Sequence, residues 1–279
     1  MINKKIGFIG AGNMAYSLIG GLISSGGNSN LIWVSDHNSN KRDSVATNFS
    51  INSCSDNQTL AATVDIIILA VKPQVLQQVC VQIATSITAN QPLIISIAAG
   101  INSDSIASWL SKAEIPLAIV RCMPNTPALV QSGATALYAV EQVSAQQKTS
   151  AESIMRSVGI TVWLEQEQQM DAVTAISGSG PAYYFQIIEI MEKSAIAMGL
   201  NKEVAHLLAV QTAFGAAKMV LESEDSPEVL RNKVTSPGGT TEKALQIMAQ
   251  EGLEELLIKA TKGAELRSKE LSTMLGSAS

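Results

Sequence analysis

Residues 1 to about 125 alternate short apolar runs with segments of helical periodicity. A run such as Ile66–Ala70 is apolar on both faces, which is typical of a parallel sheet covered by helices on each side. The predicted strands are Lys5–Ile9, Leu31–Ser35, Asp65–Val71, Leu93–Ile97 and Leu117–Arg121, and the predicted helices are Met14–Ser24, Asn40–Phe49, Gln74–Ile87 and Ser103–Leu110. This alternation predicts a doubly wound α/β domain.

A further strand pair, Ala134–Val140 and Thr161–Leu164, flanks a helix near Ala145–Val158 and is expected to extend the same sheet. From Glu165 onward the strand signals end. The predicted helices there are Glu167–Ala175, Gly180–Met198, Lys202–Leu221, Pro227–Asn232, Thr240–Gln250 and Leu253–Leu275. We therefore place a domain boundary near residue 164, with an α/β domain in residues 1–164 and an all-helical domain in residues 165–279.

Two of the late helices, Pro181–Met198 and Val204–Leu221, are apolar on nearly every face. A helix of that kind must be buried on nearly every face. One copy of the helical domain offers little with which to bury both. We therefore expect an intimate dimer in which helices of two chains share a core, and the alternative is a compact monomeric bundle.

The composition of the chain supports association and limits its partners. Of the 279 residues 46% are hydrophobic and only 15% charged, so extra apolar surface needs burial. A formal net charge of −5 argues against nucleic acid and anionic membranes as partners. The N-terminal apolar run faintly resembles a signal peptide, but glycines interrupt it. The sequence contains no uninterrupted run of about 18 apolar residues, so we expect no membrane span.

The cysteines and histidines point to no metal chemistry. Cys54, Cys80 and Cys122 are spaced neither as a disulfide framework nor as a zinc site, and His37 and His206 lie far apart in the sequence. We therefore expect reduced thiols, no bound metal and a cytoplasmic location.

The segment Gly10-Ala-Gly12-Asn-Met-Ala15 matches the G-x-G-x-x-G/A fingerprint of dinucleotide binding. In that motif the first glycine makes a tight turn, the second admits a pyrophosphate, and the third small residue lets the helix pack on its strand. The segment follows the first predicted strand and opens the first helix. This context favours a dinucleotide site over a chance glycine turn.

The end of the second strand normally distinguishes NAD from NADP. An acidic residue there, such as Asp36, takes the ribose hydroxyls of NAD. However, Ser35, Asn38, Lys41 and Arg42 are suited to hold a 2′-phosphate, unless Lys41 and Arg42 are simply the solvated first turn of a helix. The segment leaves this choice open.

Three other segments combine turn residues with polar groups. Lys72-Pro73 ends a strand where open α/β sheets bind ligands, and a plain strand–helix turn explains it equally well. Arg121–Pro127 has two prolines that fix the backbone after a strand, either beside a nicotinamide or as a structural corner. Ser177-Gly-Ser-Gly-Pro181 reads as glycines before a helix with proline at its first position, either as a cap or as an active-site element.

The segment Ser236-Pro-Gly-Gly-Thr-Thr241 stands at the start of a predicted helix. Helix N-termini bind anions through backbone N–H groups and the helix dipole. An ordinary loop is the alternative.

Together, these segments resemble the pyrroline-5-carboxylate reductase family of proline biosynthesis. The matching segments are Phe8-Ile-Gly-Ala-Gly-Asn-Met-Ala15, Leu69-Ala-Val-Lys-Pro73, Arg121-Cys-Met-Pro-Asn-Thr-Pro127, Asp171-Ala-Val-Thr174, Ser177-Gly-Ser-Gly-Pro-Ala-Tyr183, Gly215-Ala-Ala-Lys-Met219 and Val234-Thr-Ser-Pro-Gly-Gly-Thr-Thr241. They run in order from residue 6 to about residue 250, and the last is the most specific.

The resemblance implies reduction of 1-pyrroline-5-carboxylate to L-proline with NADPH, or alternatively NADH. It also implies a dinucleotide-binding domain in residues 1–164, a substrate and dimerisation domain in residues 165–279, and a domain-swapped dimer often assembled into a decamer. By motif, the cofactor contacts would be Gly10, Ala11, Gly12, Asn13, Met14, Ser35, Asn57, Ala70, Val71, Lys72 and Pro73. The substrate contacts would be Ser236, Gly239, Thr240 and Thr241.

The available side chains agree with an imine substrate. No histidine lies near any motif to act as a general acid, and a cyclic imine needs none because its nitrogen can arrive protonated. Thr241 is the expected catalytic residue, with its hydroxyl on the ring nitrogen. The rival interpretations are a related two-domain dehydrogenase of the 3-hydroxyacid or 6-phosphogluconate kind, with Lys218 as acid–base, and a nicotinamide-binding protein without catalysis.

Overall fold

The computed structural model describes residues 3–276. The chain forms two compact units, of which the first comprises Met1–Ser179 with Ala264–Ser279 and the second Gly180–Gly263. The last strand of the sheet ends at Trp163, whereas the first compact unit continues to Ser179.

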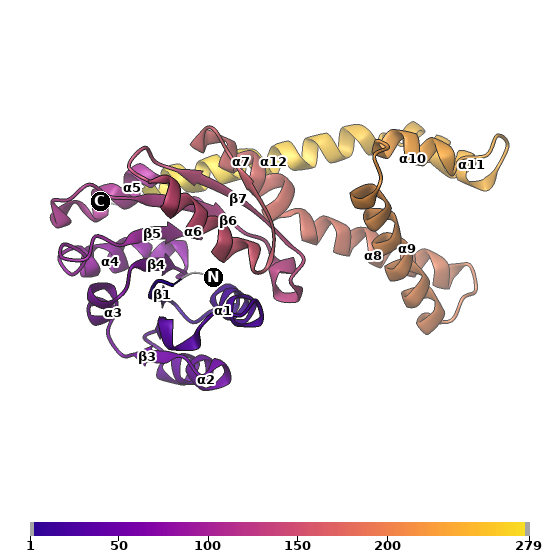
Figure 1. Ribbon diagram of the computed structural model, residues 1–279. Coiled ribbons are helices and arrows are strands. Elements are labelled where there is room, and N and C mark those ends of the chain that lie inside the picture. The colour runs from indigo at the N-terminus through magenta and orange to yellow at the C-terminus, as the bar shows by residue number, and fades with distance from the viewer. Residues whose placement is uncertain (1–2, 277–279) are drawn as a thin grey trace. The chain divides into compact units, whose positions relative to one another are not determined.

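The first unit is built on one eight-stranded sheet (Figure 1). Its strands are β1 (Ile6–Ile9), β2 (Ile32–Ser35), β3 (Asn52–Cys54), β4 (Ile66–Leu69), β5 (Leu93–Ser96), β6 (Ile119–Met123), β7 (Gly133–Ala139) and β8 (Gly159–Trp163). Their spatial order is β3-β2-β1-β4-β5-β6-β7-β8, and every neighbouring pair is parallel except β6 with β7. The doubly wound domain, and its extension by the last two strands, are confirmed.

Helices cover both faces of this sheet. They are α1 (Asn13–Ser24), α2 (Ser39–Phe49), α3 (Asn57–Thr63), α4 (Pro73–Ile83), α5 (Ser103–Trp109) and α6 (Ala145–Arg156). Phe8 and Ile68 belong to a core with residues of α1 and α6, whereas Ile67 and Leu69 belong to a second core with residues of α3, α4 and α5. Burial of successive residues in opposite cores explains why the central strands are apolar throughout.

Three details of the predicted elements were wrong. The sequence analysis missed β3 and α3, because the edge strand Asn52–Cys54 is short and polar and the helix has only seven residues. Helix α4 ends at Ile83, and the residues that follow form turns although Ala84 and Ile87 are buried. Burial therefore continued the apolar pattern past the end of the helix.

The segment after the sheet is helical, as predicted for Glu167–Ala175, but it is not a single α-helix. A 3₁₀ turn, Glu167–Gln169, leads into helix α7 (Met170–Val173), which continues as a π-helical turn, Thr174–Gly178. Ser177 and Gly178 are thus helical rather than flexible. Helix α8 starts at Gly180, as the predicted helix Gly180–Met198 does, so Pro181 is its second residue rather than its first. π-Turns of this kind occur mostly within helices and often at functional sites.

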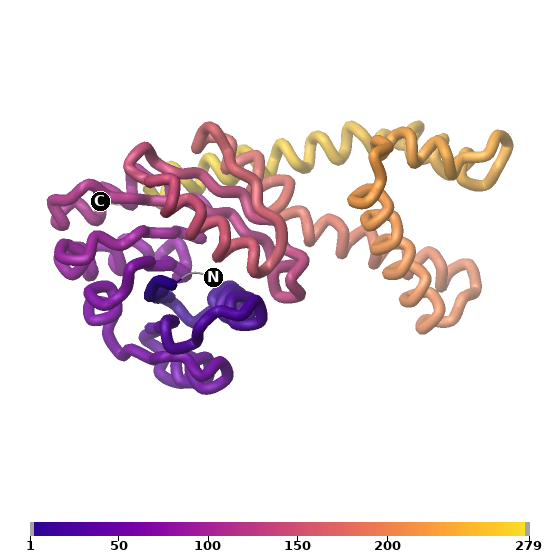
Figure 2. Tube along the Cα trace, viewed as in Figure 1, coloured from indigo at the N-terminus to yellow at the C-terminus, as the bar shows by residue number. Residues whose placement is uncertain are grey.

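The C-terminal segment returns to the first unit (Figure 2). Helix α12 spans Leu253–Gly276. The hydroxyl of Ser268 donates a 2.7 Å hydrogen bond to the Asp171 carboxylate, and Leu275 packs against the core that contains α4 and α5. The end of α12 therefore belongs to the packing of the α/β unit.

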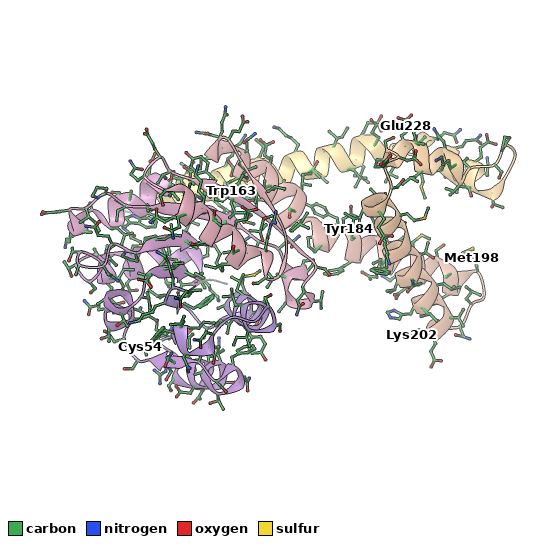
Figure 3. The ribbon with its side chains drawn as sticks, in the orientation of Figure 1. Cys54, Trp163, Tyr184, Met198, Lys202 and Glu228 are labelled. Carbon is green, nitrogen blue, oxygen red and sulfur yellow. The ribbon has the colours of Figure 1, made fainter. Side chains whose placement is uncertain are left out.

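The second unit contains the remaining helices and leaves their apolar side chains exposed. The helices are α8 (Gly180–Ala197), α9 (Lys202–Glu222), α10 (Pro227–Lys233), α11 (Thr240–Gln250) and the first part of α12. Tyr184 and Met198 are 67% and 77% exposed in the single chain (Figure 3). Since Ala205 is the only hydrophobic residue of Gly180–Gly263 in the buried core, a bundle closed within one chain does not account for this unit.

Helix α9 is long and strongly apolar. By length and composition alone it is the one helix within residues 3–276 that is apolar enough to cross a membrane, and only 6% of its most apolar window is buried within this chain. The expectation of no membrane span rested on uninterrupted apolar runs, whereas polar residues such as Gln211 and Lys218 interrupt α9. A helix shared between the cores of two soluble chains has the same composition.

Candidate functional site: a glycine-rich turn and an uncapped helix start

The turn after β1 requires glycine at Gly10. Its φ is +106°, and a Cβ there would lie 2.5 Å from the carbonyl oxygen of Ala70. Its N–H donates a 2.8 Å hydrogen bond to the carbonyl of Ser35. The turn therefore draws together the carboxyl ends of β1, β2 and β4, which is where open parallel sheets bind ligands.

Gly12 has a different reason for lacking a side chain. It precedes α1 with ordinary extended dihedrals, forms no side-chain cap, and a Cβ placed there would meet no atom within 4 Å. The first N–H groups of α1 consequently face open space with no capping group in front of them. A glycine that nothing in the fold demands, at an uncapped helix start, fits the close approach of a phosphate group.

Asp36 holds this turn in place. Its carboxylate accepts 2.8 Å hydrogen bonds from the N–H groups of Ala11 and Asn38, one at each oxygen, and its side chain is only 11% exposed. Both oxygens are thus engaged by the backbone rather than directed at a sugar. Sequence reasoning had considered Asp36 only as a ribose ligand.

A cavity of about 320 Å³ lies beside the turn, lined by residues that include Gly10, Asp36, Asn57 and Val71. The Ser35 hydroxyl donates to the Asn57 side-chain oxygen at 2.7 Å, and the Asn57 amide donates to Gln82 at 3.0 Å. These bonds fix the polar wall of the cavity. The sequence analysis missed Gln82, because it reaches the wall from α4.

The two basic residues that follow β2, Lys41 and Arg42, differ in their contacts. Arg42 is bonded through two nitrogens to Asp43, at 2.8 and 3.2 Å, whereas Lys41 is exposed at the start of α2. Asn38 caps that helix by accepting from the Lys41 N–H. His37 lines the cavity, with its Nδ1 3.3 Å from an Asp36 carboxylate oxygen, and Lys41 is exposed.

The loops after β4 and β6 are rigid. Pro73 occupies the first turn of α4, and Lys72 is the exposed residue before it, without a side-chain cap. Asn125 donates to the carbonyl and hydroxyl oxygens of Ser177 and accepts from the Ala134 N–H at 2.9 Å. A Cβ on Gly178 would come within 2.5 Å of Met123. The loop Arg121–Pro127 is therefore locked onto the π-turn.

The second unit places a tight turn before α11. Gly238 has φ +68° and donates its N–H to the Glu242 carboxylate at 2.8 Å. The Gly239 N–H bonds the carbonyl of Ser236 at 3.0 Å, and Gly239 itself provides no side-chain cap. Thr240 and Thr241 follow in the exposed first turn. Two of the expected N–H groups are thus used internally, and the N–H groups of the first helical turn remain for an anion.

Helix starts in this chain divide into two classes. The side chains of Asn38, Asp56, Asn102, Ser144, Asn201 and Ser226 cap α2, α3, α5, α6, α9 and α10. Hydrogen bonds from Thr59 illustrate the effect by lowering the pKa of Asp56 below its ordinary 3.8. Gly12, Lys72 and Gly239, which precede α1, α4 and α11, form no such cap. Gln169, before α7, forms no side-chain cap either, although α7 continues there from the 3₁₀ turn Glu167–Gln169. The starts of α1, α4 and α11 stand in candidate ligand segments.

The structure groups the candidates by unit. The first unit brings Gly10, Ala11, Gly12, Asn13, Met14, Ser35, Asn57, Ala70, Val71, Lys72 and Pro73 to the carboxyl edge of β1, β2 and β4 and the adjoining helix starts. The second unit holds Ser236, Gly239, Thr240 and Thr241 in one turn. Within residues 3–276 no group of three or more His, Cys, Asp or Glu side chains is arranged to hold a metal ion.

Two protein families match separate parts of this chain. Residues 167–271 match the family described as pyrroline-5-carboxylate reductase dimerisation, and residues 5–100 match NADP oxidoreductase, coenzyme F420-dependent. Pyrroline-5-carboxylate reductase of Pseudomonas aeruginosa is 46% identical over 276 residues, 99% of this chain and 100% of that protein.

Solved structures give the same relationship. A pyrroline-5-carboxylate reductase from Coxiella burnetii superposes with a TM-score of 0.92 at 44% identity, covering 97% of this chain and 99% of that one. The Plasmodium falciparum enzyme with NADP bound superposes with a TM-score of 0.86 at 30% identity, covering 98% and 99%. The match to a dimerisation family also accounts for the exposed apolar helices of the second unit. With sequence and fold shared over nearly its whole length, this chain belongs to the pyrroline-5-carboxylate reductase family.

Proposed function

We propose that this chain reduces 1-pyrroline-5-carboxylate to L-proline with NADPH, the last step of proline biosynthesis. The observation that carries the proposal is the similarity, over 99% of the chain, to a relative named for this reaction. The two uncapped helix starts at Gly12 and Gly239 support it, because the reaction needs a site for a dinucleotide and a site for a small carboxylate.

The residues at the first site fit a dinucleotide. The uncapped start of α1 would take the pyrophosphate, and the cavity beside Asn57 has the polar wall that a ribose needs. We assign the cofactor contacts to Gly10, Ala11, Gly12, Asn13, Met14, Ser35, Asn57, Ala70, Val71, Lys72 and Pro73. When bound, the reduced nicotinamide supplies the hydride for the imine carbon.

The geometry around Asp36 favours NADPH over NADH. A carboxylate directed at the adenosine ribose would repel a 2′-phosphate, but both oxygens of Asp36 are occupied by backbone N–H groups. His37 and Lys41 are exposed in the same segment. The NADP in the Plasmodium falciparum structure points the same way.

We assign the substrate carboxylate to the turn Ser236–Gly239 and the start of α11. Thr240 and Thr241 lie in the first turn of that helix, where unpaired N–H groups and the helix dipole favour an anion. Glu242 is committed to the Gly238 N–H, so its charge is partly offset by a hydrogen bond rather than left facing the substrate.

Thr241 is the proposed catalytic residue. Hydride addition to the C=N carbon moves the bonding electron pair onto nitrogen, and a nitrogen that arrives protonated needs no protein acid. The Thr241 hydroxyl would accept a hydrogen bond from that N–H and so orient the ring. Positioning of this kind contributes rate by making the transfer effectively unimolecular.

Steady-state rates with 1-pyrroline-5-carboxylate, using NADPH and NADH in turn, test the function. Thr241→Ala should lower kcat/KM about 10- to 100-fold, the usual effect of one lost hydrogen bond to a charged group, with NADPH affinity unchanged. Thr241→Ser keeps the hydroxyl and is the matched control. Equal turnover by the alanine and serine variants would remove Thr241 from the mechanism, and no turnover by the wild type would refute the function.

We further infer a domain-swapped dimer, with five dimers forming a decamer, and a cytoplasmic location. The exposed apolar faces of α8 and α9 and the match to a dimerisation family support the dimer. The same proposal assigns dinucleotide binding to residues 1–164 and substrate binding and dimerisation to residues 165–279. Sedimentation equilibrium measures the assembly, and monomers at micromolar concentration would contradict it.

A further inference from the structure

The loop Ile97–Asn102, between β5 and α5, is held at its C-terminal end by a side chain that no motif contains. The Glu167 carboxylate accepts hydrogen bonds from the N–H of Ser103 at 2.7 Å and from the Ser103 hydroxyl at 2.6 Å. Ser103 is the residue that follows the loop. Glu167 itself stands in the 3₁₀ turn that leads out of the sheet domain.

Glu167 also reaches the other end of the loop. Its Oε1 accepts from the Arg121 guanidinium at 2.7 Å, and Arg121 lies directly beside Ser96, the residue from which the loop leaves β5. Arg121 and Glu167 have side chains only 12% and 15% exposed. One carboxylate thus joins both ends of a six-residue loop in a site with little solvent, where such bonds are strong.

The tip of the same loop is covered. Gly100 adopts φ +73°, and its Cβ position lies 3.6 Å from the side chain of Leu271 in α12. Ile101 is fully buried, and Asn102 caps α5 through the Ser105 N–H at 2.8 Å. The loop therefore has one conformation, and the ends joined by Glu167 set where it sits.

The order of the strands places this loop on the path of the cofactor. The proposed pyrophosphate site is at β1 and the adenosine cavity on the β2 side, so the other half of the dinucleotide must extend past β4 to β5 and β6. The loops at the carboxyl ends of those strands are Ile97–Asn102 and the rigid Pro124–Pro127. The first of them therefore borders the nicotinamide half.

We infer that Glu167 is a positioning residue for hydride transfer, which fixes the nicotinamide-side loop Ile97–Asn102 by binding Ser103 and Arg121 together. The inference rests on the proposed function. Glu167 touches neither cofactor nor substrate in this arrangement. Its effect passes through the loop.

Hydrogen–deuterium exchange of the cofactor-free protein tests whether Glu167 holds the loop. Glu167→Gln should speed exchange of residues 97–103 by about 10- to 100-fold, the equilibrium factor of one lost charge-assisted hydrogen bond, and leave β1 and α1 protected. Glu165→Gln is the matched control, because Glu165 is exposed, two residues away, and lines the same surface cavity as Glu167 and Ser103. Equal acceleration across the whole sheet would show a general structural role and overturn the inference.

Single-turnover hydride transfer, at saturating NADPH and 1-pyrroline-5-carboxylate, tests the consequence. Glu167→Gln should slow it by about 10- to 100-fold through misplacement of the reacting atoms, with the dissociation constant of NADPH changed less than the rate. Ser103→Ala, which removes only the hydroxyl bond, should act in the same direction with a smaller effect, and it decides the matter if Glu167→Gln does not fold.

The outcomes separate this inference from the proposed function. An unchanged single-turnover rate in a folded Glu167→Gln or Ser103→Ala variant would overturn the positioning role while the reductase activity stands. If the wild-type protein does not reduce the imine, the proposed function fails. The exchange of residues 97–103 still decides whether Glu167 holds the loop.

Discussion

The two glycines of the turn after β1 are expected to respond differently to the same substitution. Gly10→Ala forces a side chain into φ +106°, at roughly 1–2 kcal/mol, and places its Cβ 2.5 Å from the Ala70 carbonyl oxygen. Overpacking against backbone adds about 1–3 kcal/mol. The sum, about 2–5 kcal/mol, is a large part of the 5–15 kcal/mol that stabilises a typical protein.

Gly12→Ala tests the ligand role without the strain. Its φ of −78° suits any residue and its Cβ meets no protein atom within 4 Å, so stability should change by less than about 1 kcal/mol. A methyl group would instead occupy the approach to the first turn of α1. Loss of one charge-assisted hydrogen bond to phosphate there raises the NADPH dissociation constant about 10- to 100-fold.

Thermal unfolding and NADPH titration of both variants separate the two effects. Gly10→Ala should lower the Tm by roughly 5–15 °C and also weaken NADPH binding, whereas Gly12→Ala should keep the Tm within about 3 °C and lose only binding. Gly20→Ala, in the same helix but away from the turn, is the control for helix substitution. The assignment of Gly12 to the pyrophosphate is refuted if Gly12→Ala binds NADPH as the wild type does.

Three further predictions concern single side chains. Asp36→Ala should weaken NADPH and NADH binding by similar factors, because it releases the turn at Ala11; a selective loss of NADH affinity in paired titrations would instead make Asp36 a ribose ligand. Asp56→Ala should cost about 1 kcal/mol in urea unfolding at pH 7, as a lost helix cap. Because the folded-state pKa of Asp56 lies below 3.8, the stability contributed by its charge is present above that pH and is lost as the pH falls through the lower folded-state pKa. Asp56→Asn should keep the helix cap and lose this pH dependence. Burial raises the pKa of Cys80 to about 12 and also raises that of Cys122, so alkylation of the native protein at pH 8 should modify Cys54 alone. Rapid labelling of a second thiol, detected by mass spectrometry, would contradict the burial of Cys80 and Cys122.

Hydrophobic periodicity was sufficient to predict the central architecture. Ile66–Leu69 is apolar throughout because β4 has a parallel strand on each side and a helical layer on each face, and no other element produces that run so simply. The all-round apolarity of α8 and α9 likewise predicted association, and the single chain leaves those faces exposed. In both cases the apolar pattern correctly indicated which surfaces need to be buried.

Other features depend on distances that no pattern encodes. The sequence analysis weighed Asp36 only as a ribose ligand, since its bond to Ala11 joins residues 25 positions apart. Glu167 was not considered as a functional residue, because its partners Arg121 and Ser103 lie 46 and 64 residues away and Glu167 itself stands in no motif. The contact of α12 with the first unit through Ser268 and Asp171 could not be predicted either, because the pattern of an amphipathic helix does not identify the surface on which it packs.

The helix caps offer a sequence signal that links stability to function. A capping side chain is worth about 1 kcal/mol, and six helices of this chain have one. At the uncapped starts of α1, α4 and α11 the loss is smaller: glycine is only a few tenths of a kcal/mol worse than a capping side chain, so Gly12 and Gly239 forgo little stability, and Lys72 forgoes about 1 kcal/mol. The N–H groups that a side chain would have satisfied are those that bind anions. In this chain two of the three starts follow glycines of the family motifs and the third follows Lys72. Missing caps, read beside those motifs, thus support the ligand positions proposed at α1 and α11, whereas α7 shows that a missing cap alone does not mark a site.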